Sequence, residues 1–140
     1  MAKHIIIATH ALLAKGFNET MRFIVEPNCY IHTICAFTEE KNPEESIVAL
    51  LDSISKNDTI VVLTDLLAGS VNKILAGYLK KYNFYLISGI NLAVLLELAL
   101  CDEKLINSEF IKNVIALAKE DMVYVNEKVE TLQNDEEDFF

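Results

Sequence analysis

A short apolar run near the amino terminus constrains the fold more than any other stretch of this chain. It extends from Lys3 through three isoleucines to Thr9 and His10, and a helical pattern follows directly. Such a run is typical of a buried parallel strand that leads into a crossover helix. In open α/β sheets, ligands bind at the carboxyl ends of the strands, where His10 stands. A histidine there is more often a hydrogen-bonded structural residue, so its position alone makes His10 only a candidate for chemistry.

Strand and helix patterns alternate along the rest of the chain. The helix after His10 is expected to bury one stripe of apolar side chains: Leu13, Phe17, Met21 and Ile24. Further strands are predicted at residues 30–37, 58–65 and 84–88, and further helices at residues 43–54, 71–82, 91–101 and from Ser108 onward. The alternation predicts a doubly wound α/β domain with a mainly parallel four-stranded sheet and helices on both faces.

Two segments of the carboxyl-terminal half predict contacts beyond the core of the domain: one predicts a second subunit, and the other predicts an additional strand at a sheet edge. The helix at residues 91–101 is apolar almost all round, with only Glu97 interrupting it. Such a helix must be covered on both sides, so we expect a second subunit to cover the side that faces away from the sheet. Met122–Val125 has strand propensity and leaves no room for another crossover helix, so we expect it to add at a sheet edge.

The composition limits the class of protein. With 140 residues, 52% of them hydrophobic, the chain should form one domain, assigned to residues 1–130. Residues 131–140 carry a run of four acidic residues, 135–138, and are expected to form an acidic, disordered tail. The net charge of −9 argues against binding to nucleic acid or an anionic membrane surface. The three cysteines match no zinc pattern, and no apolar run is long enough to span a bilayer, so we expect a cytoplasmic protein with reduced thiols and no membrane insertion.

A carboxylate ends the third predicted strand as His10 ends the first. If these strands are neighbours, as in the strand order 2-1-3-4, His10 and Asp65 flank the point where such folds bind ligands. A carboxylate beside an imidazole fixes the tautomer and leaves the other ring nitrogen as a nucleophile. The alternative is that the two residues are unrelated, one capping a helix and the other accepting hydrogen bonds from loop amides.

Ser70 adds an anion site to this candidate pair. It stands at a predicted helix amino terminus behind the small residues Ala68 and Gly69, which let backbone amides approach a ligand. An ordinary serine N-cap is an equally common explanation. The chain has no P-loop, no Gly-x-Gly-x-x-Gly motif after the first strand, no metal-ligand spacing and no nucleophile elbow. The remaining interpretation is a phosphate site with a histidine nucleophile and no metal, nucleotide or other cofactor.

Three segments of the chain resemble one family, the IIA component of the mannose/fructose/sorbose class of bacterial sugar phosphotransferase systems. Residues 5–11 are similar to its first strand, which ends in the phosphorylated histidine. Residues 64–70 are similar to its Asp-x-x-Gly-Gly-Ser-Pro loop, and residues 88–97 to its Gly-Val-Asn-Leu-Pro-Met-Leu-Leu-Glu helix. The segments have the order and spacing of the family, and the resemblance covers nearly the whole chain.

The resemblance implies a role for each candidate residue. His10 would accept a phosphoryl group from the histidine-containing phosphocarrier protein and pass it to a IIB component for phosphorylation coupled to uptake. Asp65 would pair with the other ring nitrogen. The residues that would hold the phosphate oxygens are Ser70, Gly69, Ala68 and Thr9. The family also implies a homodimer in which the carboxyl-terminal strand is exchanged between subunits.

The chain departs from the family pattern at three positions beside these residues. Ala11 and Ala68 replace glycines, and Val71 replaces a proline. No reactive group is lost, but the alanines narrow the backbone conformations available next to the phosphate. Two other functions remain open: a phosphocarrier subunit of phosphoenolpyruvate-dependent dihydroxyacetone kinase, and a regulatory domain that reports the state of the phosphotransferase system.

Overall fold

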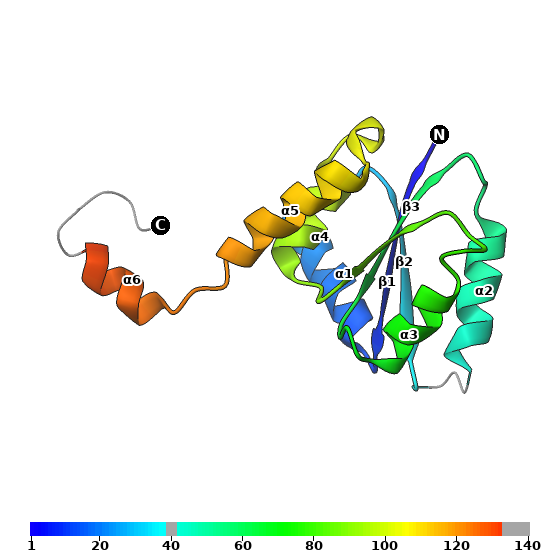
Figure 1. The fold of residues 1–140 in the computed structure, drawn as a ribbon, viewed down its shortest axis with the longest axis horizontal. Coiled ribbons are helices and arrows are strands. Elements are labelled where there is room, and N and C mark those ends of the chain that lie inside the picture. The colour runs from blue at the N-terminus through cyan, green and yellow to red at the C-terminus, as the bar shows by residue number, and fades with distance from the viewer. Residues whose placement is uncertain (39–41, 133–140) are drawn as a thin grey trace.

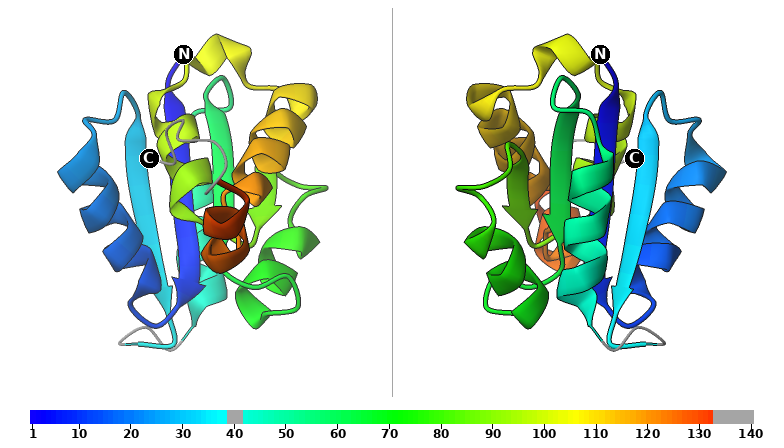
Figure 2. Two further views of the ribbon diagram at one scale, coloured as in Figure 1. Left: turned by 90° about the vertical axis from the view of Figure 1, so that its left-hand side faces the viewer. Right: turned by 90° about the vertical axis from the view of Figure 1, so that its right-hand side faces the viewer.

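The computed structural model describes residues 1–38 and 42–132, where one sheet lies between two layers of helices (Figure 1). The sheet contains four strands: β1 (Lys3–His10), β2 (Tyr30–Ala36), β3 (Thr59–Thr64) and β4 (Tyr85–Ser88). Their order is β2-β1-β3-β4 and every pair is parallel, as the side-by-side strands in Figure 2 show. The predicted doubly wound α/β fold with strand order 2-1-3-4 is therefore confirmed, and the sheet is wholly parallel.

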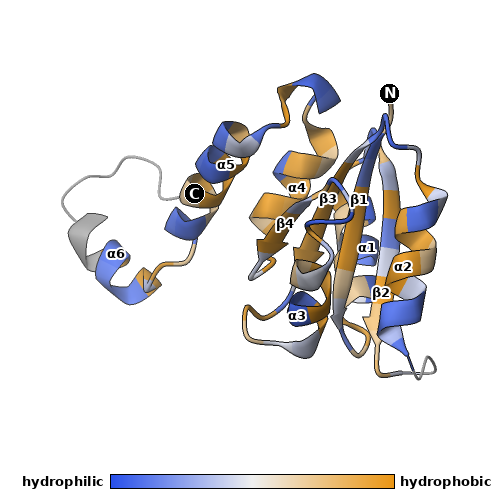
Figure 3. Cartoon of the chain, turned by 45° about the vertical axis from the view of Figure 1, so that its right-hand side comes forward, coloured by the Kyte–Doolittle hydropathy of each residue, from blue (hydrophilic) through white to orange (hydrophobic). Residues whose placement is uncertain are grey.

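Burial on both faces explains the uninterrupted apolar run of β1. Ile5 and Ile7 point into one core and Ile6 and Ala8 into the other, all at most 1% exposed. Because successive side chains of a strand point to opposite faces, a strand covered on both sides needs apolar residues at every position. Figure 3 shows the same pattern as hydrophobic colouring along the strands. β1 also lies between β2 and β3, which places its carboxyl end at the centre of the sheet edge.

The helices divide between the two faces. One face carries α1 (Leu13–Ile24), α4 (Leu92–Leu100) and α5 (Ser108–Glu120), and the other carries α2 (Pro43–Ser53) and α3 (Ser70–Gly77). A short 3₁₀ turn, η1 (Glu103–Leu105), joins α4 to α5. Asparagine side chains at residues 42, 91 and 107 cap α2, α4 and α5 by accepting a hydrogen bond from a backbone amide of the first turn.

Two of the sequence expectations for helices were wrong in detail. In α1, Leu13 and Ile24 are 48% and 51% exposed, and the fully buried residues are Ala14 and Met21. The small Ala14 side chain lets the first turn of α1 lie close to the sheet, which turns Leu13 outward. The helix predicted at residues 71–82 ends at Gly77, a residue that disfavours the helix interior, and turns follow it.

The predicted edge strand at Met122–Val125 was also wrong. Residues 122–124 have no regular secondary structure, and α6 (Val125–Leu132) follows them. A strand needs an edge to pair with, and α5 carries the chain away from the sheet before residue 122 is reached (Figure 1). Residues 131–132 belong to α6, and the predicted disordered tail otherwise lies outside the described residues. Among the residues described, no helix is long and apolar enough to cross a membrane.

Candidate functional site

The site is built at the carboxyl ends of the two central strands. His10 is the last residue of β1, and Asp65 follows the last residue of β3, its neighbour in the sheet. The Nδ1 atom of His10 lies 2.8 Å from Oδ2 of Asp65, and the His10 backbone amide donates to the same oxygen at 2.9 Å. The side chain of His10 is 38% exposed and that of Asp65 only 10%. The fold thus presents the imidazole to solvent and holds its carboxylate partner beneath the surface.

Hydrogen bonds keep Asp65 in its ionised form. Burial raises the pKa of the Asp65 carboxyl, but the amide and imidazole of His10 and the amide of Leu66 all donate to it, and together they lower that pKa below its ordinary value. An ionised carboxylate only accepts hydrogen bonds, so the proton of the neutral imidazole resides on Nδ1. Nε2 therefore carries the lone pair and is the nucleophilic atom of the ring.

The loop after β3 approaches this nucleophilic atom. Ser70 is the first residue of α3, and its Oγ lies 3.4 Å from Nε2 of His10. Gly69 caps the helix, and a Cβ placed there would lie only 3.0 Å from Cε1 of His10. Gly69 is therefore the residue that lets the loop lie against the imidazole. The backbone N–H groups of the first turn of α3 have no acceptor within the helix, so they can donate hydrogen bonds to an anion beside Nε2.

The other two residues predicted to bind phosphate lie differently. Thr9 is fully buried, and its hydroxyl accepts a hydrogen bond from the Ala14 amide at 2.7 Å, so it caps the start of α1. The structure does not direct this hydroxyl toward Nε2 of His10. Ala68 lies exposed at the tip of the loop between β3 and α3.

Asn72 supports the site from behind and was not recognised from the sequence. Its Oδ1 accepts a hydrogen bond from the Thr64 hydroxyl at 2.8 Å, and its Nδ2 donates to the Leu67 carbonyl at 3.0 Å. Buried amides with both ends bonded rigidify the segments that they join. Asn72 thus ties the loop to the end of β3. The available signal was an asparagine in the first turn of the predicted helix, where its side chain can form hydrogen bonds with nearby backbone.

Two residues beside His10 have left-handed backbone conformations. Ala11 has φ +51° and Phe37, directly after β2, has φ +63°. Ala11 is the position where the family pattern has glycine, and the positive φ is the physical reason for that glycine. The Phe37 ring stacks on the His10 imidazole, with centroids 5.7 Å apart and planes inclined by 28°. Phe37 is not among the residues for which the sequence predicts a role.

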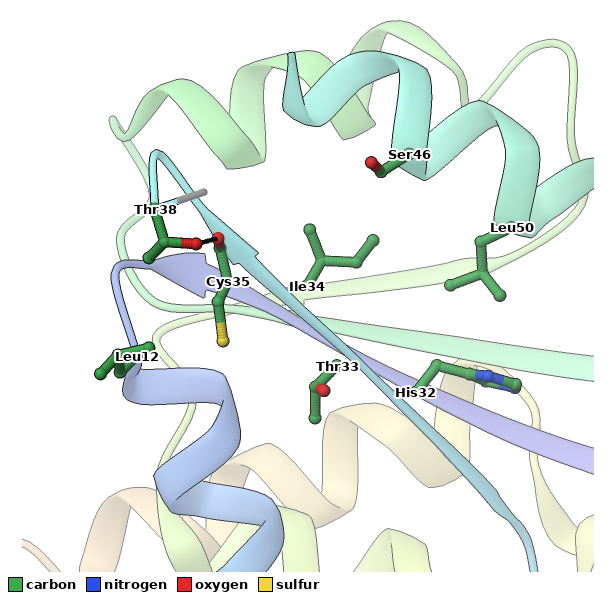
Figure 4. A pocket seen from close by; sticks show the side chains of 8 residues that line it. All are labelled: Leu12, His32, Thr33, Ile34, Cys35, Thr38, Ser46 and Leu50. Carbon is green, nitrogen blue, oxygen red and sulfur yellow. Dashed lines mark hydrogen bonds between the residues drawn. The ribbon is translucent and has the colours of Figure 1, made fainter. Parts of the chain in front are cut away.

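A groove of about 740 Å³ lies along the exposed edge of β2, beside the site (Figure 4). Leu12 and Thr38 line the end of the groove nearest the site, and His32 and Leu50 lie at the other end. His10 and Asp65 do not line this groove. The His10 imidazole therefore lies at the exposed edge of the sheet and outside this groove. Among the described residues, no cluster of three metal-ligating side chains accompanies the site.

Comparison with known proteins identifies the family. The model of the PTS system fructose IIA component matches residues 4–115. A chain from Klebsiella pneumoniae, assigned to a phosphoenolpyruvate-dependent sugar phosphotransferase system permease, is 33% identical, with 92% of this chain and 95% of that chain covered and a TM-score of 0.81. This protein belongs to the IIA components of the fructose and mannose class of sugar phosphotransferase systems.

Two more distant structures show the same fold. The PTS IIA protein associated with the fucose utilization operon from Streptococcus pneumoniae is 23% identical, covers 92% of this chain and 97% of its own, and has a TM-score of 0.77. The mannose/sorbose specific IIA subunit from Enterococcus faecalis is 20% identical, with coverage of 89% and 95% and a TM-score of 0.73. A search of curated proteins finds no match to this sequence.

Proposed function

We propose that this chain is a phosphoryl carrier that uses His10 as its acceptor. His10 takes the group from the histidine-containing phosphocarrier protein and passes it to a IIB component in the cytoplasm. The observation that supports this proposal best is the 2.8 Å contact between Nδ1 of His10 and the Asp65 carboxylate. It leaves Nε2 unprotonated and directed to the surface, where a second protein can reach it.

Each residue then has a defined task in the transfer. The Nε2 lone pair forms a bond to phosphorus while the bond from phosphorus to the donor histidine breaks. Positive charge develops on the His10 ring, and the Asp65 carboxylate faces that charge. Ser70 and the free amides at the start of α3 stabilise the phosphoryl oxygens. Because the transition state is loose, positioning and hydrogen-bond donors supply most of the catalysis, and no metal or nucleotide is needed.

The surface around His10 suits transient docking of two protein partners. Leu12, Leu66 and Leu67 come from the loops after β1 and β3 and are 63%, 62% and 77% exposed. Exposed apolar side chains that surround a polar centre are typical of protein–protein contacts. The donor and the acceptor protein would use this same face in turn.

A direct test is phosphorylation with phosphoenolpyruvate, enzyme I and the phosphocarrier protein. Mass spectrometry should detect one acid-labile phosphate on the wild type and none on His10→Ala. Absence of the adduct from the wild type, or its persistence in His10→Ala, would refute the proposal.

Asp65→Ala should keep the fold and slow the transfer to His10. Removal of the carboxylate leaves the ring tautomer unfixed and the developing charge unopposed, so we expect a rate decrease of about 100-fold or more. Rapid-quench mixing with the phosphorylated donor protein measures this rate. Unchanged kinetics would show that the pairing does not contribute to transfer.

We also propose that the chain forms a homodimer. Leu100 on α4 and Leu117 on α5 are 50% and 67% exposed, and both line a groove between these helices. Figure 3 shows that α4 is hydrophobic around most of its surface. The segment from Met122 to α6 leaves the sheet, with Met122 91% and Tyr124 65% exposed. A second copy of the chain would cover both surfaces.

A further inference from the structure

Phe37 adopts a backbone conformation that its side chain disfavours. It follows β2 directly, with φ +63°, and a bulky residue in the left-handed region is an outlier. The preceding residue, Ala36, pairs with His10 in the parallel ladder between β1 and β2. The Thr38 hydroxyl donates to the Cys35 carbonyl at 2.8 Å and closes the turn around Phe37. The chain therefore turns sharply at the point where β2 ends beside His10.

The turn places the Phe37 ring against one face of the imidazole. The ring centroids are 5.7 Å apart and the planes are inclined by 28°. The other contacts of His10 lie at its edges: Asp65 at Nδ1, Ser70 near Nε2 and Gly69 near Cε1. A hydrogen bond at one ring nitrogen still allows the ring to tilt about that bond. A contact on the face opposes this tilt.

The tilt of the ring matters because the Nε2 lone pair lies in the ring plane. In-line attack on phosphorus requires that lone pair to point along the axis of the bond that breaks. We propose that Phe37 is a positioning residue, whose ring holds the plane of the His10 imidazole so that Nε2 points at the incoming phosphorus. This inference rests on the proposed role of His10 as phosphoryl acceptor.

A simpler role for Phe37 would be docking alone, since its side chain is 54% exposed. Docking does not require the left-handed conformation, because Leu12, Leu66 and Leu67 expose apolar surface in the same region without positive φ. Backbone strain that persists beside a reactive group is a feature of functional sites. At Phe37, the strained backbone conformation accompanies the stacking of its ring on the His10 imidazole.

A small chemical donor separates positioning from docking. Phosphoramidate needs no protein surface to transfer its phosphoryl group. The Nε2 lone pair forms the new bond to phosphorus while the phosphorus–nitrogen bond of the donor breaks. The nitrogen of phosphoramidate is already protonated, so it leaves as neutral ammonia. The variants to compare are Phe37→Leu, which loses the aromatic face, and Phe37→Tyr, which keeps it. Phe23→Leu provides the same chemical change at a side chain that is 91% exposed on α1.

With phosphoramidate, we expect Phe37→Leu to be phosphorylated about fivefold or more slowly than the wild type, and Phe37→Tyr and Phe23→Leu within about twofold of it. In NMR spectra, the ring-proton resonances of His10 should shift in Phe37→Leu and return in Phe37→Tyr. Circular dichroism establishes that each variant is folded.

Equal phosphoramidate rates for the wild type and Phe37→Leu would overturn the inference while leaving the proposed function intact. A defect of Phe37→Leu that appears only with the protein donor, as a raised KM, would also overturn it, because Phe37 would then serve docking alone. Failure of both phosphoramidate and the phosphorylated carrier protein to label wild-type His10 would overturn the proposed function and this inference together.

Discussion

At the scale of single residues, two positions beside His10, Gly69 and Ala11, restrict which amino acids the backbone can accommodate. Gly69 lies against the imidazole, where a Cβ would be 3.0 Å from Cε1 of His10 and 3.2 Å from the Leu66 carbonyl oxygen. Ala11, which follows His10 in the chain, has φ +51°, a conformation that glycine adopts without cost. At residue 69 a side chain would collide with the imidazole, and the chain has glycine there. At residue 11 a side chain causes only backbone strain, and the chain has alanine there.

Gly69→Ala should slow phosphorylation of His10 while leaving the protein folded. The added methyl group must displace the imidazole or the loop, and small misplacements of a reacting group reduce rates by roughly 10- to 100-fold. Transfer kinetics from the phosphorylated donor measure the effect. Gly77→Ala is the matched control, because a Cβ at that position would meet no atom within 4 Å other than its chain neighbours and the backbone of its own helix. Equal effects of the two substitutions would contradict this assignment.

Ala11→Gly should stabilise the protein. Release of the left-handed backbone strain should raise the free energy of unfolding by about 1–2 kcal/mol. The greater conformational freedom of glycine in the unfolded chain should lower it by about 0.5–1 kcal/mol. We therefore expect the free energy of unfolding to rise by up to about 1.5 kcal/mol. Ala116→Gly, on the exposed side of α5, should lower it by about 1 kcal/mol. Urea unfolding measures both changes, and a loss of stability in Ala11→Gly would show that the strain is absent.

At the scale of elements, β1 carries polar clusters at both ends. His10 ends the strand, and His4 lies near its start, where Nε2 of His4 is 2.9 Å from Oδ2 of Asp58 and Nδ1 is 3.0 Å from Nε2 of His32. Burial and the charge of His4 lower the pKa of His32 from its ordinary value of 6.5. The pairing of β1 with β2 therefore contains a histidine that is held in its neutral form.

Acidification should weaken the fold through His32. A lowered pKa means that the unfolded chain binds the proton more readily, so the contribution of His32 to stability is present above about pH 6.5 and lost as the pH falls through its lowered pKa. We expect the wild type to lose more stability than His32→Gln between about pH 7.5 and 5.5. Thermal unfolding across this range measures the difference. Parallel losses in the two proteins would contradict the shift.

At the scale of the whole molecule, the described chain leaves apolar surface uncovered on one side. The exposed residues of the segment after α5 lie far from the sheet (Figure 1). An isolated helix of eight residues, such as α6, is not stable in water without packing. These features support the proposed homodimer, in which each subunit packs against its partner.

Substitution of the exposed segment should dissociate that dimer. We expect sedimentation equilibrium to give the mass of two chains for the wild type and of one chain for Met122→Asp combined with Tyr124→Asp. A charge buried without a partner in an apolar interface opposes association. Phe23→Asp tests an equally exposed side chain of α1 and should remain dimeric. A monomeric wild type would refute the proposed dimer.

The four-stranded parallel sheet and His10 could both be predicted from the order of residues along the chain. Strands buried on both faces require unbroken apolar runs, so β1 and β3 and the polar residues that end them were visible as patterns. The family match then connected His10 with Asp65 and Ser70.

The contacts that hold His10 and the loop after β3 in place could not be predicted from local patterns. The stacking of Phe37 on His10 and the support from Asn72 depend on strand pairing and on backbone dihedrals that no periodicity records. Thr9 turned inward to cap α1 for the same reason. Met122–Val125 has strand propensity, but its structure depends on which edge lies within reach, so local preference could not determine it. Local patterns determine which segments form strands and helices, whereas long-range pairing determines which side chains meet.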